Sequence, residues 1–277
     1  MREHKILSED IENQIIDNYE NKKKGQLYCA KQAGISPYKV KQILIKHGIH
    51  IRTYSEAAVK SNIQRRKYIV NENYFNTQSH NMAYLLGFFA ADGSISKDSN
   101  EIKITLSSVD KDFLQSIADE LECTSPVRIF TNSKGFECCS LKFSSRIIKD
   151  TFRQYGIVPN KTFTLNFPKN LDKKYWIDFI RGFFDGDGSV STAGKNAIRW
   201  QLCCANKEPL ETIVDFFYKE YNIPTVSILV RNPITKNGHP LYYCQYSTVS
   251  TRKIFDILYV DDSLYLPRKK DKFKSLI

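Results

Sequence analysis

An internal repeat is the feature that most constrains how this chain can fold. Residues 85–95, LLGFFAADGSI, recur as IRGFFDGDGSV at residues 180–190, an offset of 95 residues in register. The similarity continues at three places further along, so we infer two copies of one unit over about residues 74–277. These places pair Ile102–Leu106 with Ile198–Leu202, Asp110 with Asn206, and Pro159-Asn160-Lys161 with Pro267-Arg268-Lys269.

The residue pattern within each copy predicts the order helix, two strands, helix, two strands, helix. In the first copy Ile102 and Ile104 alternate with Lys103 and Thr105, a period of two that is typical of a strand with one buried face. The second copy repeats the alternation at residues 198–202. We therefore predict an α+β fold of two pseudo-symmetric αββαββα repeats with antiparallel sheets.

The polar faces of these predicted sheets carry basic, hydroxyl and amide side chains. If the two sheets lie side by side, the faces form one continuous basic surface suited to DNA phosphates and base edges. A solvated face is common on antiparallel sheets, and this plainer interpretation stays open for each strand taken alone. The residues expected to line a DNA groove are Lys103, Thr105, Arg128, Lys142, Arg199, Gln201, Arg231, Tyr243 and Gln245.

Residues 1–53 show a different pattern, which predicts a three-helix helix-turn-helix domain. Two amphipathic segments precede the turn Gly34-Ile35-Ser36-Pro37, which leads into a third helix. Ser36 fits the N-cap and Pro37 the first helical position, where its missing N–H costs nothing. A basic three-helix bundle that enters no DNA groove is the alternative. The third-helix side chains expected to contact DNA are Tyr38, Lys39, Lys41, Gln42 and Lys46.

The charge distribution points to a polyanionic partner. The chain has a formal net charge of +11, and residues 1–70 hold 14 Lys and Arg against 7 Asp and Glu, a net of +7. Such a balance favours nucleic acid, although many basic proteins bind none. Residues 54–73, with Arg65, Arg66 and Lys67, are expected to be a basic linker that follows phosphates. The two copies are expected at 74–170 and 171–277.

Small residues at helical spacing predict close packing of the two motif helices. Gly87 and Ala91 lie four residues apart, as do Gly182 and Gly186, so each pair shares one helix face. Side chains this small let two helix backbones approach each other. We therefore expect the two copies to meet along these faces.

Each motif helix is expected to end on a carboxylate. Asp92 and Asp187 precede Gly93 and Gly188, which we expect to end the helices in a left-handed cap. The two carboxylates would then lie side by side near a pseudo-two-fold axis, at helix C-termini where the dipole disfavours negative charge. Hard oxygen ligands favour Mg²⁺ or Mn²⁺, which can activate water for phosphodiester cleavage. Simple helix termination is the alternative role.

The motifs LLGFFAADG and IRGFFDGDG resemble the paired helices of LAGLIDADG homing endonucleases, and GIVPNKTFTL and YLPRKKDKF resemble later segments of that family. The resemblance implies a saddle-shaped sheet platform and a monomer that cuts both strands of a long asymmetric site in double-stranded DNA. It also implies that Asp92 and Asp187 hold the metal, with help from the backbone carbonyls of Ala91 and Gly186.

The resemblance implies roles for four further residues. Lys161 and Lys269 match lysines that act on the attacking water or on transition-state charge, although each could instead contact a phosphate or solvent. Asp110 and Asn206 match a polar position that orients water in the family. These four residues complete the predicted catalytic set.

The chain departs from the family pattern at one carboxylate position. The first copy has Ala90 where the second has Asp185. In the family the metal ligand is the carboxylate just before the final glycine, so this departure leaves activity intact. Asp185 is expected to be a helix-end or interface residue.

Other functions remain open. A cleavage-inactive nucleic-acid binder, such as an RNA-splicing maturase or a DNA-binding regulator, would share this fold, and the intact aspartate pair favours cleavage over it. An HNH-type nuclease is suggested by His80-Asn81, but the other histidines offer no partner at useful spacing. The terminal residues of an intein are missing, so we expect a free-standing, intron-borne or phage-borne nuclease.

Cysteine usage and hydropathy restrict the compartment. The seven cysteines include no CxxC and no paired Cys/His spacing, so neither zinc nor a disulfide framework is expected. The apolar stretches are far shorter than the roughly 20 residues that cross a bilayer, and residues 1–8 contain no apolar signal segment. We expect the cytoplasm of a bacterial or phage host, or an organelle interior.

Overall fold

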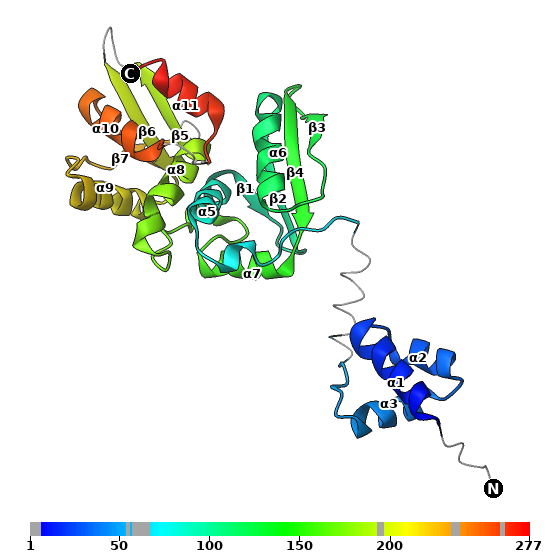
Figure 1. Cartoon of the computed structure of the whole chain (residues 1–277). Coiled ribbons are helices and arrows are strands. Elements are labelled where there is room, and N and C mark those ends of the chain that lie inside the picture. Colours follow the sequence, from blue (N-terminus) through cyan, green and yellow to red (C-terminus); the bar gives the residue numbers. More distant parts are fainter. Residues whose placement is uncertain (1–6, 54–55, 57–66, 193–196, 234–238, 261–263) are drawn as a thin grey trace. The chain divides into compact units, whose positions relative to one another are not determined.

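The computed structural model describes residues 7–53, 56, 67–192, 197–233, 239–260 and 264–277. The chain forms two compact units, Met1–Lys67 and Tyr68–Ile277, which are described one at a time (Figure 1). Arg65 and Arg66 of the expected linker lie outside the described residues. The last residues of that expected linker belong to the second unit, where the Ile69 backbone N–H donates to Thr124 Oγ1 at 2.9 Å.

Residues 7–53 of the first unit contain the helices α1, α2 and α3. α1 (Glu9–Ile16) continues into a π-helical turn (Asp17–Asn21), and α2 (Gln26–Ala33) and α3 (Pro37–Lys46) follow. The Ser36 hydroxyl accepts a hydrogen bond from the Lys39 backbone N–H at 3.2 Å, which confirms the predicted cap. Gly34 follows α2 in the left-handed conformation, with φ of 63°, and permits the tight turn into α3. The core of this unit buries Ile15, Tyr19, Cys29, Ala30, Val40, Ile43 and Leu44.

The second unit holds both copies of the repeat (Figure 1). The first copy contains α5 (His80–Asp92), β1 (Gly93–Ile95), β2 (Glu101–Ser107), α6 (Lys111–Glu120), β3 (Arg128–Thr131), β4 (Glu137–Ser144) and α7 (Arg146–Gln154). The second contains α8 (Trp176–Asp187), β5 (Gly188–Thr192), β6 (Ile198–Cys204), α9 (Glu208–Tyr221), β7 (Leu229–Arg231), β8 (Leu241–Tyr246), α10 (Thr248–Leu258) and α11 (Pro267–Lys274). Short 3₁₀ turns lie at Tyr74–Asn76, Ser108–Asp110, Lys161–Phe163 and Lys173–Tyr175.

The two antiparallel sheets have the same strand order. It is β1-β2-β4-β3 in the first copy and β5-β6-β8-β7 in the second. Each sheet buries one face under helices, as the predicted alternation requires: Ile102 and Ile104 are fully buried, whereas Lys103 lies opposite Lys142 on the other face. One continuous hydrophobic core runs through both copies. Among the described residues, no helix is both long enough and apolar enough to span a membrane.

The motif helices α5 and α8 pack backbone to backbone, as the small residues predict. A Cβ added to Gly87 would overlap the carbonyl oxygen of Phe179, and one added to Gly182 would overlap the carbonyl oxygen of Tyr84. These two contacts are equivalent under the 95-residue offset of the repeat. Any side chain at either glycine would push the helices apart.

The predicted left-handed ends of these helices are wrong. Gly93 and Gly188 have φ of −72° and −85°, so the chain runs directly into β1 and β5 in extended conformation. Glycine is needed at these two positions because neighbouring aromatic rings leave no room for a Cβ. A Cβ on Gly93 would lie 2.8 Å from the Phe89 ring, and one on Gly188 would overlap the Phe184 ring. A glycine after a helix can serve a left-handed backbone or a site with no room for a Cβ, and the sequence alone does not show which of the two applies.

Candidate active site at the ends of the motif helices

The ends of α5 and α8 bring Asp92 and Asp187 together. A Cβ built on Gly186, the residue before Asp187, would lie 3.2 Å from Oδ2 of Asp92 and would overlap the Cβ of Ala91. Only one of the two matched positions, Ala91 or Gly186, has room for a methyl group. The two carboxylates predicted from the repeat therefore share one site.

Burial raises the pKa of both carboxyl groups. Desolvation raises the pKa of Asp187 to about 6, and the negative charge of Asp92 adds to the rise, while Lys161 and Lys269 oppose it. Desolvation also raises the pKa of Asp92, against the positive charges of Lys269, Arg268 and Lys161. Although protein surrounds the Asp187 carboxylate on most sides, the residue itself is exposed. Solvent and a ligand can therefore reach the pair.

Lys161 and Lys269 are anchored beside this pair. The Lys161 ammonium donates a hydrogen bond to the carbonyl of Gly93, and the Lys269 ammonium donates to the carbonyl of Gly188. Burial lowers the pKa of both lysines, and nearby carboxylates oppose that shift. Each predicted lysine is thus bonded to the glycine that directly follows one of the two aspartates, Gly93 after Asp92 and Gly188 after Asp187.

Asp110 and Asn206 are held by contacts of different kinds. Asp110 is buried, and both of its carboxylate oxygens accept hydrogen bonds from Nε of Arg268, at 2.9 and 2.8 Å. The Asn206 amide donates to the Leu165 carbonyl at 3.0 Å and to Oδ1 of Asn166 at 2.9 Å. Asp110 contributes to the potential at Asp92, whose pKa it raises. The water-orienting role of Asp110 and Asn206 stays a prediction.

Asp185 is a buried acceptor that connects the two copies. Its carboxylate accepts hydrogen bonds from the hydroxyls of Tyr84 (2.8 Å) and Tyr259 (2.6 Å) and from the Leu266 backbone N–H (2.7 Å). Burial raises the pKa of Asp185 to about 6, while these three hydrogen bonds lower it. The residue therefore joins α5 of the first copy to the segment that begins α11.

A hollow of about 320 Å³ opens beside Asp187 and was not predicted from the sequence. Its lining includes Ala90, Lys161, Cys203 and Leu241. Ala90 is small where the other copy has Asp185, and this difference contributes to the space. The Cys203 thiol accepts a hydrogen bond from the Gln201 amide at 3.2 Å. In the sequence, the departure at Ala90 signals that the two copies differ at this place.

The donor set at the helix ends fits a hard divalent cation. Two partly desolvated carboxylates that repel each other gain from a shared positive charge, and Mg²⁺ is commonly held by one or two carboxylates with waters and substrate phosphates. The described residues contain no group of three or more His, Cys, Asp or Glu side chains placed to hold a metal. The donors to consider are thus Asp92 and Asp187, with the carbonyls of Ala91 and Gly186.

The sheet residues predicted to contact DNA lie on the faces opposite the core. Lys142 forms an ion pair with Glu101 at 2.5 Å, and the Arg231 guanidinium lies 5.6 Å from the centre of the Tyr243 ring. The other predicted residues are Lys103, Thr105 and Arg128 in the first sheet and Arg199, Gln201 and Gln245 in the second. The strand register places several of them directly opposite one another on neighbouring strands: Lys103 opposite Lys142, Ser140 between Thr105 and Arg128, and Gln201 opposite Gln245.

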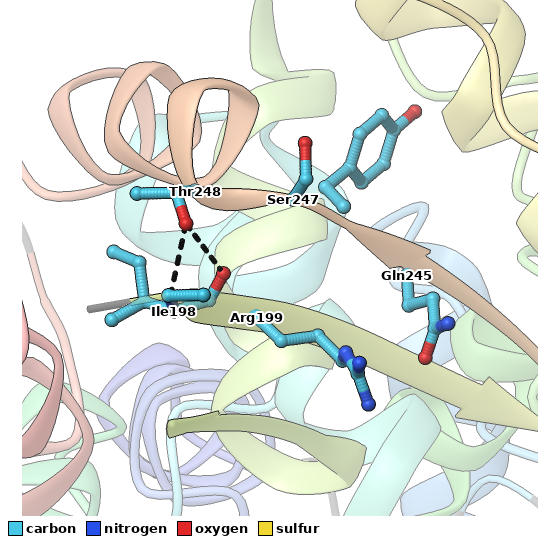
Figure 2. A pocket seen from close by; sticks show the side chains of 7 residues that line it. Ile198, Arg199, Gln245, Ser247 and Thr248 are labelled. Atoms are coloured by element: carbon cyan, nitrogen blue, oxygen red, sulfur yellow. Dashed lines mark hydrogen bonds between the residues drawn. The ribbon is translucent and has the colours of Figure 1, made fainter. Parts of the chain in front are cut away.

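Arg199 and Gln245 extend from the neighbouring strands β6 and β8 and point to the same side (Figure 2). They line a hollow of about 340 Å³. The Thr248 hydroxyl, at the start of α10, accepts a hydrogen bond from the Ile198 backbone N–H at 3.1 Å and donates to the Ile198 carbonyl at 3.4 Å. These bonds fix the helix against β6, so the hollow has a rigid wall.

On α3 the predicted DNA contacts are not equally available. Tyr38, Lys41 and Gln42 are exposed, with Tyr38 at 72%. Lys46 instead forms an ion pair with Glu12 of α1 at 2.8 Å. Lys39 is half-buried and supplies the N–H that the Ser36 cap accepts. Lys67, within the predicted linker, is exposed.

Known proteins show similarity to parts of this chain. An uncharacterised protein of Methanocaldococcus jannaschii, MJ0314, is 27% identical over 184 residues, which cover 62% of this chain and 66% of that protein. The DNA-directed RNA polymerase subunit Rpo1C of the same organism is 26% identical over 157 residues, which cover 55% of this chain and 17% of the subunit. The chain thus spans under two thirds of each of these relatives.

Among solved structures, the N-terminal LAGLIDADG domain of DUF199/WhiA matches at 17% identity and a TM-score of 0.43, over 81% of this chain and 98% of that one. The homing endonuclease I-WcaI, bound to its DNA recognition sequence, matches at 11% identity and a TM-score of 0.45, over 81% of this chain and 96% of that one. I-DmoI, in complex with DNA and Ca, matches at 18% identity and a TM-score of 0.43, over 74% of this chain and 99% of that one. Residues 79–136, which include α5 and Asp92, match the family described as LAGLIDADG-like domain.

Proposed function

We propose that this chain is a site-specific double-strand DNA endonuclease that hydrolyses phosphodiester bonds with Mg²⁺ or Mn²⁺ held by Asp92 and Asp187. One observation carries the proposal: two copies of one motif helix bring both carboxylates to a shared site, together with the half-buried Lys161 and the buried Lys269. The LAGLIDADG-like match over residues 79–136 covers the first of these helices. Paired acidic ligands that hold metal at a phosphodiester are a recurring arrangement in nucleases.

The residues of the site supply position and charge. Asp92 and Asp187, with the carbonyls of Ala91 and Gly186, would hold the metal, which when bound supplies an activated water and neutralises phosphate charge. Lys161 and Lys269 keep positive charge fixed at the carbonyls of the two following glycines. Preorganised charge of this kind stabilises a phosphorane-like transition state without reorganisation cost during the reaction.

The DNA-binding surface of the proposed enzyme has two parts. The polar faces of the two sheets would form a pseudo-symmetric, saddle-shaped platform for a long asymmetric target, bound by a monomer. Exposed basic side chains on both sheets support this proposal: Arg128 and Lys142 on the first, Arg199 and Arg231 on the second. The first unit would act as a helix-turn-helix domain that inserts α3 into a major groove, through Tyr38, Lys41 and Gln42.

A second candidate function is nucleic-acid binding without cleavage, as in a splicing maturase or a DNA-binding regulator. The observation that favours it is the local charge balance. Lys161 and Lys269 face the carboxylates of Asp92 and Asp187, so two positive charges compensate two negative ones without a metal. Such a site would be stable in a protein that binds DNA and has no catalytic step.

Cleavage of a duplex library separates the two functions. The protein is incubated with long random duplexes and Mg²⁺, and cut ends are sequenced. We expect cuts within one defined sequence, lost with Asp92→Asn or Asp187→Asn while DNA affinity is kept, because the carboxylates serve the metal and not the phosphates. The exposed Asp98→Asn is the matched control and should cut normally. Specific binding with no cut ends would favour the second candidate.

A further inference from the structure

Arg268 connects the two copies of the repeat beside one carboxylate of the pair. It lies in the first turn of α11, in the second copy, and donates through Nε to both oxygens of Asp110, in the first copy. The Asp110 side chain is 4% exposed, whereas the Arg268 side chain is 50% exposed. A buried carboxylate therefore fixes an arginine whose outer part faces solvent. Charge-assisted bonds of this type are strong and directional.

The outer nitrogens of Arg268 are left for a ligand. Both bonds to Asp110 use Nε, and within the described residues neither Nη1 nor Nη2 donates to a protein atom. The guanidinium acts on the proposed active site, since its positive charge is among those that oppose the raised pKa of Asp92. A planar guanidinium held by its inner nitrogen presents two donors in the geometry that suits a pair of phosphate oxygens.

The residues before and after Arg268 are both anchored. The Leu266 N–H donates to the buried carboxylate of Asp185 at 2.7 Å, and the Lys269 ammonium donates to the carbonyl of Gly188. Asp185 is itself held by two tyrosine hydroxyls. The position of Arg268 is therefore determined before any DNA binds, and ordering it costs little on binding.

The first copy is built differently at each of these positions. Ala90 stands where the second copy has Asp185, and Asn160 stands where it has Arg268. The segment that corresponds to the start of α11 is only the 3₁₀ turn Lys161–Phe163. Asn160 has a left-handed backbone, with φ of 58°. Because residue 160 is an asparagine, the first copy supplies no arginine beside Asp187 in the way that Arg268 lies beside Asp92.

We propose that Arg268 binds the DNA phosphate cleaved beside Asp92, and that, because Asn160 occupies the equivalent position of the other copy, the two DNA strands are cut at unequal rates. The strand beside Asp92 is cut first, and a nicked duplex accumulates. The order of the cuts is then a property of the fold and stays the same when the target sequence changes. This inference rests on the proposed endonuclease function.

Strand-resolved kinetics test the inference. A duplex carrying the selected target is labelled on each strand in turn, and both nicking rates are measured for wild type and Arg268→Gln. We expect the faster strand to slow by about tenfold or more, as for loss of one preorganised donor to a transition state, and the other strand to change little. Lys272→Gln, which removes the same charge from the same helix, should preserve the strand bias. Equal slowing of both strands by Arg268→Gln would overturn the inference.

A double-mutant cycle separates phosphate binding from simple neutralisation of Asp110. If Arg268 only compensates the buried carboxylate, Arg268→Gln has no effect in an Asp110→Asn background. Phosphate binding predicts loss on the same single strand in both backgrounds, smaller with Asp110→Asn, because the asparagine oxygen still accepts from Nε but holds it more weakly than the carboxylate. Thermal unfolding of all four proteins checks that each is folded. A strand effect that vanishes with Asp110→Asn contradicts the proposal.

Binding in EDTA provides a readout that needs no cleavage. The affinity of a labelled random duplex is measured over a range of salt concentrations, and Arg268→Gln should lower the slope of log K against log salt by about one, the value for one phosphate contact. If wild type binds but cuts nothing, the endonuclease proposal fails while this slope still reports on Arg268. A slope equal to that of wild type would refute the phosphate contact.

Discussion

Asp187 links activity to stability at the scale of one residue. Its pKa in the folded protein is about 6, against an ordinary value of 3.8, so between these values the folded chain binds more protons than the unfolded chain. The free energy of unfolding therefore falls as pH rises through this window, and above about pH 6 the charged carboxylate destabilises the metal-free fold. Metal binding should relieve this destabilisation.

We predict that Asp187→Asn raises the Tm of the metal-free protein at pH 7 and that the gain disappears near pH 4. Because Asp187 is exposed, solvent screens much of this effect, and a relief of about 1 kcal/mol would correspond to roughly 2–4 °C. Unfolding is followed by circular dichroism in EDTA, with exposed Asp98→Asn as a control that should leave Tm unchanged. Mg²⁺ should then stabilise wild type more than the variant. A lower Tm for Asp187→Asn at pH 7 would show that the carboxylate makes a stabilising contact.

Single residues also show which parts of the site the sequence predicts and which it does not. The repeat predicts Asp92, Asp187 and the two lysines, because each is found twice in the same context. The bond between Asp110 and Arg268 joins residues 158 positions apart, and nothing in either local pattern marks it. The left-handed caps were predicted wrongly because the aromatic rings that exclude a Cβ are visible only once the strands are placed.

At the scale of elements, alternation predicts the strands and their two faces. A period of two assigns Lys103 and Ile102 to opposite sides whatever the tertiary structure, and the register confirms this assignment. The availability of a face residue is a different property. Lys142 is paired with Glu101 at 2.5 Å, a contact set by the pairing of β2 with β4 and not by either strand alone. We therefore expect unequal contributions to DNA binding from residues of similar sequence pattern.

The prediction for this surface is that Arg199→Ala weakens specific DNA binding by about 1–3 kcal/mol, the range for removal of a base-reading side chain. Lys142→Ala should cost less, because Lys142 already has a partner in Glu101. Fluorescence anisotropy in EDTA measures both. Lys219→Ala on α9, which packs on the opposite face of the second sheet, is the control. If Arg199→Ala behaves like Lys219→Ala, the DNA does not bind on this face.

At the scale of the whole molecule, the chain divides its work between two units with separate cores. The carboxylates, the lysines and Arg268 all belong to the second unit. The first unit carries much of the basic charge, since residues 1–70 hold a net +7 of the total +11. A tethered module of this kind raises affinity through effective concentration and leaves the chemistry unchanged.

We therefore predict that a chain beginning at Tyr68 stays folded and keeps metal-dependent cleavage, but needs a higher protein concentration. Its footprint on DNA should be shorter on one side only, and its salt slope should fall by about one for each phosphate that the first unit binds in the full chain. In the full chain, Lys41→Gln should reproduce part of this decrease, whereas Lys46→Gln should do less, because Lys46 is paired with Glu12 at 2.8 Å. Footprinting and salt titration of the four proteins measure these effects. A footprint and slope that do not change on truncation would mean that α3 binds something other than DNA, since a module bound to phosphates cannot be removed without altering both.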